Sequence, residues 1–176
     1  TTVPDLNQAE DSRALVVIPL GGSSMELWTA RLAEIDRPEI YITDRDKAPP
    51  AQPKYHRHIT EWNQRANCIA YSTTKKELEN YLHPTAIQSI APTFPNTIND
   101  FDNVPMMLAE ALHTANANAP AWDTVTDEHK KEKASKAKRR LNQECVENMT
   151  AALLAQSDPG GEIVVWLKTV GAKLAT

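Results

Sequence analysis

Hydrophobic positions in the first half of the chain alternate between runs typical of strands and stripes typical of helices. Residues 13–20 form a continuous apolar run of the kind that fills a strand buried on both faces. Residues 39–43 and 68–71 are short, rich in β-branched or aromatic side chains, and predict two further strands. Residues 23–35 and 58–67 place apolar side chains at helical spacing between them. This strand–helix order predicts βαβ units, and therefore an α/β fold with a parallel sheet.

The pattern becomes mostly helical beyond residue 84. Apolar spacing predicts three longer helices there, over residues 104–116, 126–156 and 162–174. We therefore expect an α/β core over residues 13–90, followed by a helical C-terminal part over residues 91–176.

Composition narrows the class of protein. With 176 residues, 41% hydrophobic and 24% charged, the chain is long enough for one well-buried domain. Its apolar clusters are too short to cross a bilayer and no signal segment precedes them, so we expect a cytoplasmic protein without a membrane partner. Cys68 lies in an apolar run and Cys145 in a helical one, and both are interpreted as reduced core thiols.

Two acidic residues follow the predicted strand over residues 39–43. Because a strand projects residues i and i+2 to the same side, Asp44 and Asp46 can direct two carboxylates to one point beyond its carboxyl end. Ligands bind at that end of open α/β sheets, and paired carboxylate oxygens suit Mg²⁺ or Mn²⁺. The alternative is an acidic turn that only ends the strand.

A second acidic pair follows the next predicted strand. If the strands are parallel, Glu77 or Glu79 lies at the same edge of the sheet as Asp44 and Asp46. The alternative is that both glutamates are ordinary charges in a helical first turn, where they favour the helix dipole.

Positive charge concentrates in one helical segment, at Lys130, Lys131, Lys133, Lys136, Lys138, Arg139 and Arg140. Such a helix is either a solvated charged surface or a contact for nucleic-acid phosphates. One of its lysines could also stabilise phosphate charge at the metal site. A competing metal signal, His56 and His58, lacks the surrounding ligands typical of a zinc site.

Four segments together resemble a known family. They are Val-Val-Ile-Pro-Leu-Gly-Gly at residues 16–22, Tyr-Ile-Thr-Asp-Arg-Asp at 41–46, Lys-Lys-Glu-Leu-Glu-Asn-Tyr-Leu at 75–82, and Lys-Arg-Arg-Leu-Asn at 138–142. In this order they resemble the TOPRIM domain of the overcoming-lysogenization-defect (OLD) family of nucleases. The resemblance implies a TOPRIM-like parallel sheet flanked by helices and a Mg²⁺- or Mn²⁺-dependent endonuclease that cleaves DNA, in a setting such as phage defence.

The resemblance also implies roles for particular residues and partners. Asp44, Asp46 and Glu79 would be metal ligands, with Glu77 completing or supporting the catalytic site. Lys136 or Lys138 would be the basic catalytic residue. Partners would be DNA and an N-terminal ABC-type ATPase domain in the same parent chain, and the family allows a homodimer.

Two features depart from the family pattern. The first TOPRIM strand, with its terminal Glu, and the helix after it have no counterpart before residue 13, and no Walker motif occurs. We therefore expect a fragment that holds part of its metal site. The rival hypothesis is a noncatalytic TOPRIM-like module that binds nucleic acid or protein. A primase- or topoisomerase-type TOPRIM protein would need segments that this chain lacks.

Overall fold

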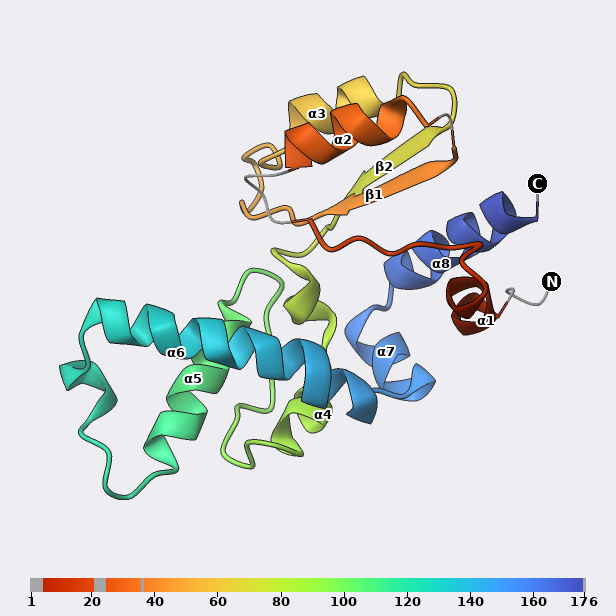
Figure 1. Cartoon of the computed structure of the whole chain (residues 1–176). Coiled ribbons are helices and arrows are strands. Elements are labelled where there is room, and N and C mark those ends of the chain that lie inside the picture. Colours follow the sequence, from red (N-terminus) through yellow and green to blue (C-terminus); the bar gives the residue numbers. More distant parts are fainter. Residues whose placement is uncertain (1–4, 21–24, 36, 176) are drawn as a thin grey trace. The chain divides into compact units, whose positions relative to one another are not determined.

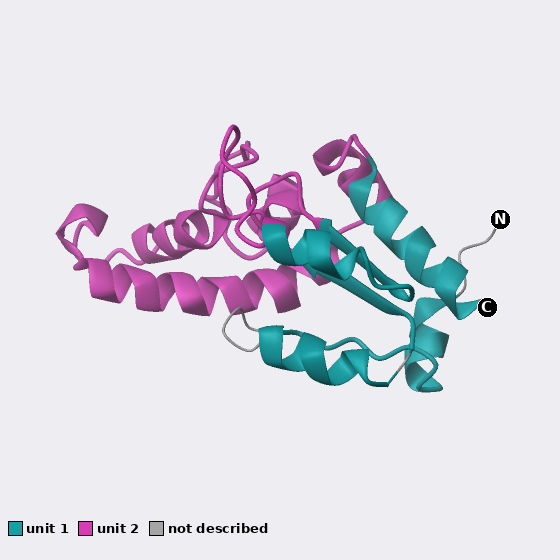
Figure 2. Ribbon diagram, turned by 90° about the horizontal axis from the view of Figure 1, so that it is seen from above, with its two compact units in different colours: residues 1–42, 57–71, 161–176 teal, residues 43–56, 72–160 magenta. Residues whose placement is uncertain are grey.

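The computed structural model describes residues 5–20, 25–35 and 37–175. The chain forms two compact units that interleave in the sequence (Figure 2). Unit 1, teal in Figure 2, comprises residues 1–42, 57–71 and 161–176. Unit 2, magenta, comprises residues 43–56 and 72–160. These units are defined by contacts in space. The boundary between an α/β core and a helical C-terminal part at residue 90 remains a prediction from the sequence.

A parallel two-stranded sheet confirms the α/β class. Strand β1 (Glu39–Thr43) pairs with β2 (Cys68–Ser72), and helix α3 (His56–Trp62) lies between them in the sequence (Figure 1). The strands match the two short stretches that the β-branched and aromatic residues predict. Since a crossover connects them, their carboxyl ends lie at the same edge of the sheet.

Aromatic contacts attach helices to the sheet within unit 1. The Tyr41 ring lies 4.7 Å from that of Trp62 in α3, and the Tyr71 ring lies 6.4 Å from that of Trp166 in α8 (Glu162–Leu174). Helix α2 (Met25–Ala33) reaches α3 through Glu26, whose Oε1 is 2.9 Å from His58 Nε2. Through these ring contacts, α3 packs against β1 and α8 packs against β2.

The prediction of a strand over residues 13–20 is wrong. After α1 (Leu6–Asp11) this segment is irregular, and the Val16 and Val17 side chains are 68% and 62% exposed. A continuous apolar run indicates a preference for burial, but a strand also needs a neighbour to pair with. Within the described ranges, β1 and β2 pair only with each other. The expected start of the following helix near Ser23 lies outside the described residues.

Unit 2 has a helical core. Helix α5 (Val104–Thr114) packs along α6 (Asp127–Arg140), as Figure 1 shows, with α4 (Pro84–Gln88) nearby and a 3₁₀ turn, η2 (Trp122–Thr124), in the connection. The buried cluster consists of Leu82, Ile87, Ala91, Phe94, Val104, Leu108, Ala109, Ala111, Ala137, Leu141 and Cys145. Burial of this apolar surface is the main stabilising contribution to unit 2.

The helical pattern predicted over residues 126–156 is interrupted. Helix α6 continues into a π-helical turn, η3 (Leu141–Cys145), and a 3₁₀ turn, η4 (Val146–Asn148), before α7 (Ala151–Ser157) begins. The Thr150 hydroxyl accepts the Leu153 N–H at 3.2 Å and caps α7. An N-cap needs an extended backbone, so Thr150 favours a new helix start over continuation of α6.

Two simpler expectations can be compared with the structure directly. Cys68 and Cys145 are both free thiols with buried side chains, as predicted. Over the described ranges, none of the helices combines the length and the apolar character that a bilayer crossing requires.

Replacing the core residue Leu141 with Ala should lower the free energy of unfolding by about 2–5 kcal/mol, because its side chain is fully buried and a cavity would remain. Urea denaturation followed by circular dichroism measures this change. Val146→Ala is the control, since Val146 is 49% exposed and should change stability by only about 0.5 kcal/mol. Equal losses in the two variants would contradict this core.

Candidate functional site

The segments that leave β1 and β2 are joined by the Thr73 hydroxyl. Thr73 is 1% exposed, and its backbone N–H donates to Thr43 O at 2.9 Å, continuing the sheet pairing. Its Oγ1 accepts the Arg45 N–H at 2.8 Å and donates to Lys75 O at 2.6 Å. The two segments therefore leave the sheet edge in a fixed relation to one another.

Asp44 contacts the acidic segment that follows β2. Its Oδ1 accepts the backbone N–H of Leu78 at 3.0 Å, at the start of the 3₁₀ turn η1 (Leu78–Tyr81). Glu77 and Glu79 flank Leu78 in the sequence. The structure thus brings Asp44, the first acid after β1, to the acidic segment that follows β2, as the parallel arrangement predicts, whereas Asp46 pairs with Lys54.

Lys138, in the last turn of α6, joins both glutamates. Its Nζ donates to Glu77 Oε2 at 2.8 Å and forms an ion pair with Glu79 Oε2 at 3.2 Å. Asn142, one helical turn later, donates through Nδ2 to Glu79 Oε1 at 2.8 Å. The carboxylate cluster is defined here as Asp44, Glu77 and Glu79. Its two glutamates are held by one cation from α6 and one amide from η3.

Burial and neighbouring charges shift the pKa values of Asp44 and Lys138. Burial raises the pKa of Asp44 to about 6, against opposing contributions from the Lys138 charge and the Leu78 hydrogen bond, while Glu79 and Glu77 raise it further. Burial alone would lower the pKa of Lys138, but its hydrogen bond to Glu77 and the charges of Glu79 and Glu77 prevail. The pKa of Lys138 is therefore raised, and it remains an ammonium at neutral pH.

One oxygen in the cluster lacks a hydrogen bond. Glu79 is 2% exposed, and its Oε2 is a buried atom that accepts no hydrogen bond from the described part of the chain. Its compensation is the charge of Lys138 at 3.2 Å. A buried carboxylate oxygen with unused lone pairs is costly, and it is suited to a further cation.

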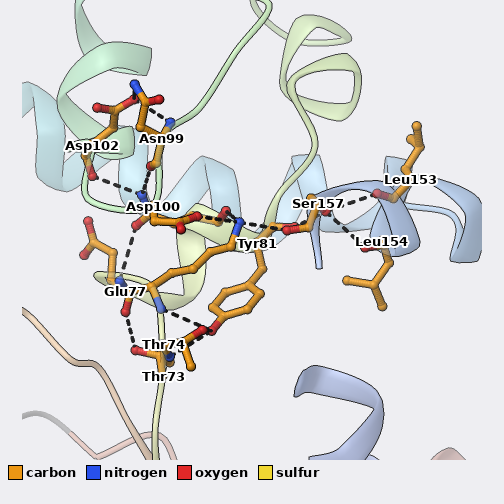
Figure 3. Close-up of polar contacts among 12 residues, drawn as sticks. Thr73, Thr74, Glu77, Tyr81, Asn99, Asp100, Asp102, Leu153, Leu154 and Ser157 are labelled. Carbon is orange, nitrogen blue, oxygen red and sulfur yellow. Dashed lines mark hydrogen bonds and ion pairs between the residues drawn. The ribbon is translucent and has the colours of Figure 1, made fainter. Parts of the chain in front are cut away.

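A partly buried lysine, Lys75, holds the loop that carries the glutamates. Figure 3 shows the polar contacts of this region, with Glu77, Asp100 and Ser157 labelled. Lys75 Nζ donates to Ser157 O at 2.7 Å and to Asn80 O at 3.2 Å, and lies 3.1 Å from Asp100 Oδ1. The Asn80 side chain donates to the carbonyls of Asn99 and Asp102. These contacts tie η1 to two distant segments and fix the backbone that positions the carboxylate cluster.

Asp46 takes a different direction from Asp44. Its φ angle is 62°, a left-handed conformation that Asp tolerates better than most residues, and its N–H donates to Lys76 O at 2.8 Å. This turn ends the alternation of a strand, so the i, i+2 argument no longer applies. The Asp46 carboxylate instead lies 3.4 Å from Lys54 Nζ.

The remaining candidates are not joined to the cluster. Lys136 pairs with Glu132 at 2.6 Å on an exposed side of α6. His58 faces Glu26 in unit 1. In the part of the chain that the structure describes, no three His, Cys, Asp or Glu side chains are arranged to ligate one ion.

The sequence analysis gave no role at the site to three residues that help to build it, Asn142, Thr73 and Lys75. Asn142 could have been found from its position four residues after Lys138, which places both on one side of a helix. Thr73 could have been found as the first residue after β2. Lys75 carries no such signal, because its partners Asp100 and Ser157 are distant in the sequence.

Comparison of the chain with models of protein families, with curated proteins and with solved structures found no match. The joined carboxylate cluster and Lys138 are therefore the features that a functional assignment has to explain.

Replacing Asp44 with Asn should stabilise the protein in EDTA at pH 7 and have little effect at pH 4. Asp44 ionises near pH 4 when unfolded but near pH 6 when folded. Between these values the folded state keeps a proton that the unfolded state has lost. The wild type therefore loses stability relative to the variant as the pH rises through this window.

Asn keeps an oxygen that can accept the Leu78 N–H, so the substitution mainly removes the charge. Urea denaturation of both proteins at pH 4, 5, 6 and 7 measures the difference in free energy of unfolding. A difference that does not change with pH, or that shrinks as the pH rises, would contradict a raised pKa for Asp44.

Proposed function

We propose that this chain is a divalent-metal-dependent endonuclease domain that cleaves DNA phosphodiesters, the nuclease part of an OLD-like ATPase–nuclease. The observation that carries the proposal is the meeting of Asp44, Glu77 and Glu79 with Lys138. Carboxylates and one cation at the carboxyl edge of a parallel sheet suit phosphoryl chemistry, in which charge stabilisation is the main requirement.

Asp44 and Glu79, supported by Glu77, are the proposed ligands of Mg²⁺ or Mn²⁺, and a bound ion would have to draw these side chains together, since as described they do not have the arrangement of a metal site. Hard carboxylate oxygens suit these ions, and the buried Glu79 Oε2 has lone pairs that accept no described hydrogen bond. The three carboxyl groups of the cluster also outnumber the single ammonium of Lys138. Asp46 would join them only after release from Lys54. A bound ion would activate water and stabilise the leaving oxygen.

Lys138 is proposed to stabilise negative charge on the phosphate during cleavage. Its raised pKa keeps it protonated, so it serves as a point cation rather than as a base. Asn142 is a proposed positioning residue, because its amide holds Glu79 Oε1 and leaves Oε2 facing Lys138. These assignments favour Lys138 over Lys136 as the basic residue of the site.

DNA is the proposed substrate because the cluster lies beside the basic helix. Helix α6 contains seven Lys or Arg residues against the three acids Asp127, Glu128 and Glu132. Positive charge on a nuclease surface attracts phosphates and releases their counterions. The resemblance to OLD-family proteins supports the further proposals of an N-terminal ABC-type ATPase partner domain and of a homodimer.

The second candidate function is a noncatalytic binding module. The observation that favours it is that Lys138 already compensates Glu77 and Glu79, as a purely structural ion-pair cluster would. In that case α6 would bind DNA in a salt-dependent way without regard to divalent ions.

Nicking of supercoiled plasmid in Mg²⁺ or Mn²⁺ tests the nuclease proposal. Lys138→Met should reduce the rate by about 10²–10³-fold, the typical cost of one group that stabilises transition-state charge. Asp44→Ala and EDTA should abolish nicking. Lys136→Met is the matched control, because it removes a lysine of the same helix that pairs with Glu132 instead, and it should retain near wild-type activity.

Equal losses in the two lysine variants would refute the role given to Lys138. Plasmid binding without nicking, unchanged by EDTA and by Asp44→Ala, would favour the binding module.

A further inference from the structure

One stripe of α6 runs from the carboxylate cluster toward the start of the helix. Lys131 and Ser135 precede Lys138 by seven and three residues, which places all three on one side of an α-helix. Asn142 follows Lys138 by four residues and continues the stripe. Its Nδ2 donates both to Glu79 Oε1 and to Lys138 O. The polar stripe is defined as Lys131, Ser135, Lys138 and Asn142.

The core side of the helix lies next to this stripe. Ala137, Leu141 and Cys145 are buried in the core of unit 2. Lys131 and Ser135, by contrast, are exposed. The stripe therefore starts at the helix surface and ends at the carboxylate cluster.

Some of the Lys and Arg side chains of α6 already contact a partner side chain, and others do not. Lys136 pairs with Glu132, Arg140 with Glu144, and Lys130 lies over the Trp122 ring. Among the described residues, Lys131, Lys133 and Arg139 make no ion pair. Of these three, Lys131 alone shares the stripe with Lys138, because Lys133 lies about 200° away around the helix.

We propose that the polar stripe is a docking track for one backbone strand of double-stranded DNA, with Lys131 and Ser135 holding a phosphate upstream or downstream of the cleaved bond. The proposal rests on the nuclease function proposed above, for which it names the substrate-binding surface. An exposed lysine and a hydroxyl are both common donors to phosphate oxygens, and such contacts position a duplex without reading its sequence.

The length of the stripe fits this role. Seven residues of α-helix span about 10 Å, which is long enough to reach from the carboxylate cluster to a neighbouring phosphate on the same strand. A phosphate at Lys131 would therefore lie close along the strand to a phosphate at Lys138. Asp127 and Glu128, in the first turn of α6, repel phosphate and mark the end of the track.

The test compares Lys131→Ala with Lys133→Ala, two substitutions of unpaired lysines in one helix. Binding to a fluorescent 30-base-pair duplex is measured by anisotropy in EDTA across a range of salt concentrations, so that cleavage plays no part. Lys131→Ala should weaken binding about eightfold at 0.1 M salt and reduce the slope of log affinity against log salt by about one. Lys133→Ala should match the wild type.

A second variant tests the hydroxyl position. Ser135→Asp places negative charge on the exposed stripe and should weaken binding at least as much as Lys131→Ala. Circular dichroism confirms that each variant keeps its helical content, so that a loss of binding is not a loss of fold.

The outcomes separate this proposal from the nuclease function. Equal effects of the two lysine variants, with plasmid nicking intact, would overturn the track and leave the nuclease function standing. A wild-type protein that does not bind the duplex at low salt would overturn both the track and DNA as the substrate. Preferential binding of single-stranded RNA would overturn the choice of partner.

Discussion

The ion pair between Lys138 and the buried Glu79 is the interaction on which the site depends. A carboxylate that is 2% exposed needs a compensating charge, and Lys138 supplies it from a helix 59 residues later in the sequence. Glu77 shares the same ammonium. This pair therefore joins the segment that follows β2 to helix α6 within unit 2. It also leaves more negative than positive charge, which is what a divalent ion would require.

Two separate supports determine where the members of the pair lie. Leu141 and Ala137 are buried against the α5 side of unit 2, so they fix the rotation of α6 and direct Lys138 outward to the glutamates. The loop that carries the glutamates is fixed by Lys75 and Thr73, whose side chains donate hydrogen bonds to backbone carbonyls. Partial burial of Asp44 disfavours its ionised form and so raises its pKa. Such destabilised charge is typical of functional sites.

Local sequence signals predicted the parts of the fold that depend on short-range physics. The β-branched and aromatic residues predicted β1 and β2. The expected parallel order of these strands predicted that Asp44 would lie near Glu77 and Glu79. The same reasoning failed at residues 13–20, where burial preference alone did not supply a pairing partner, and at Asp46, where one positive φ angle ended the alternation. That Lys138 rather than Lys136 contacts the glutamates also required the structure, since the rotation of α6 is set by contacts with α5 that no local pattern encodes.

Titration of the metal-free protein with Mn²⁺, followed by the electron paramagnetic resonance signal of the free ion, tests the central claim most directly. The account predicts saturable binding at pH 7.5 that is lost in Glu79→Gln. Binding should weaken at pH 5, because Asp44, with a pKa of about 6, is then protonated. Absence of saturable binding at pH 7.5, or equal binding by Glu79→Gln, would contradict the claim that this cluster holds a divalent ion.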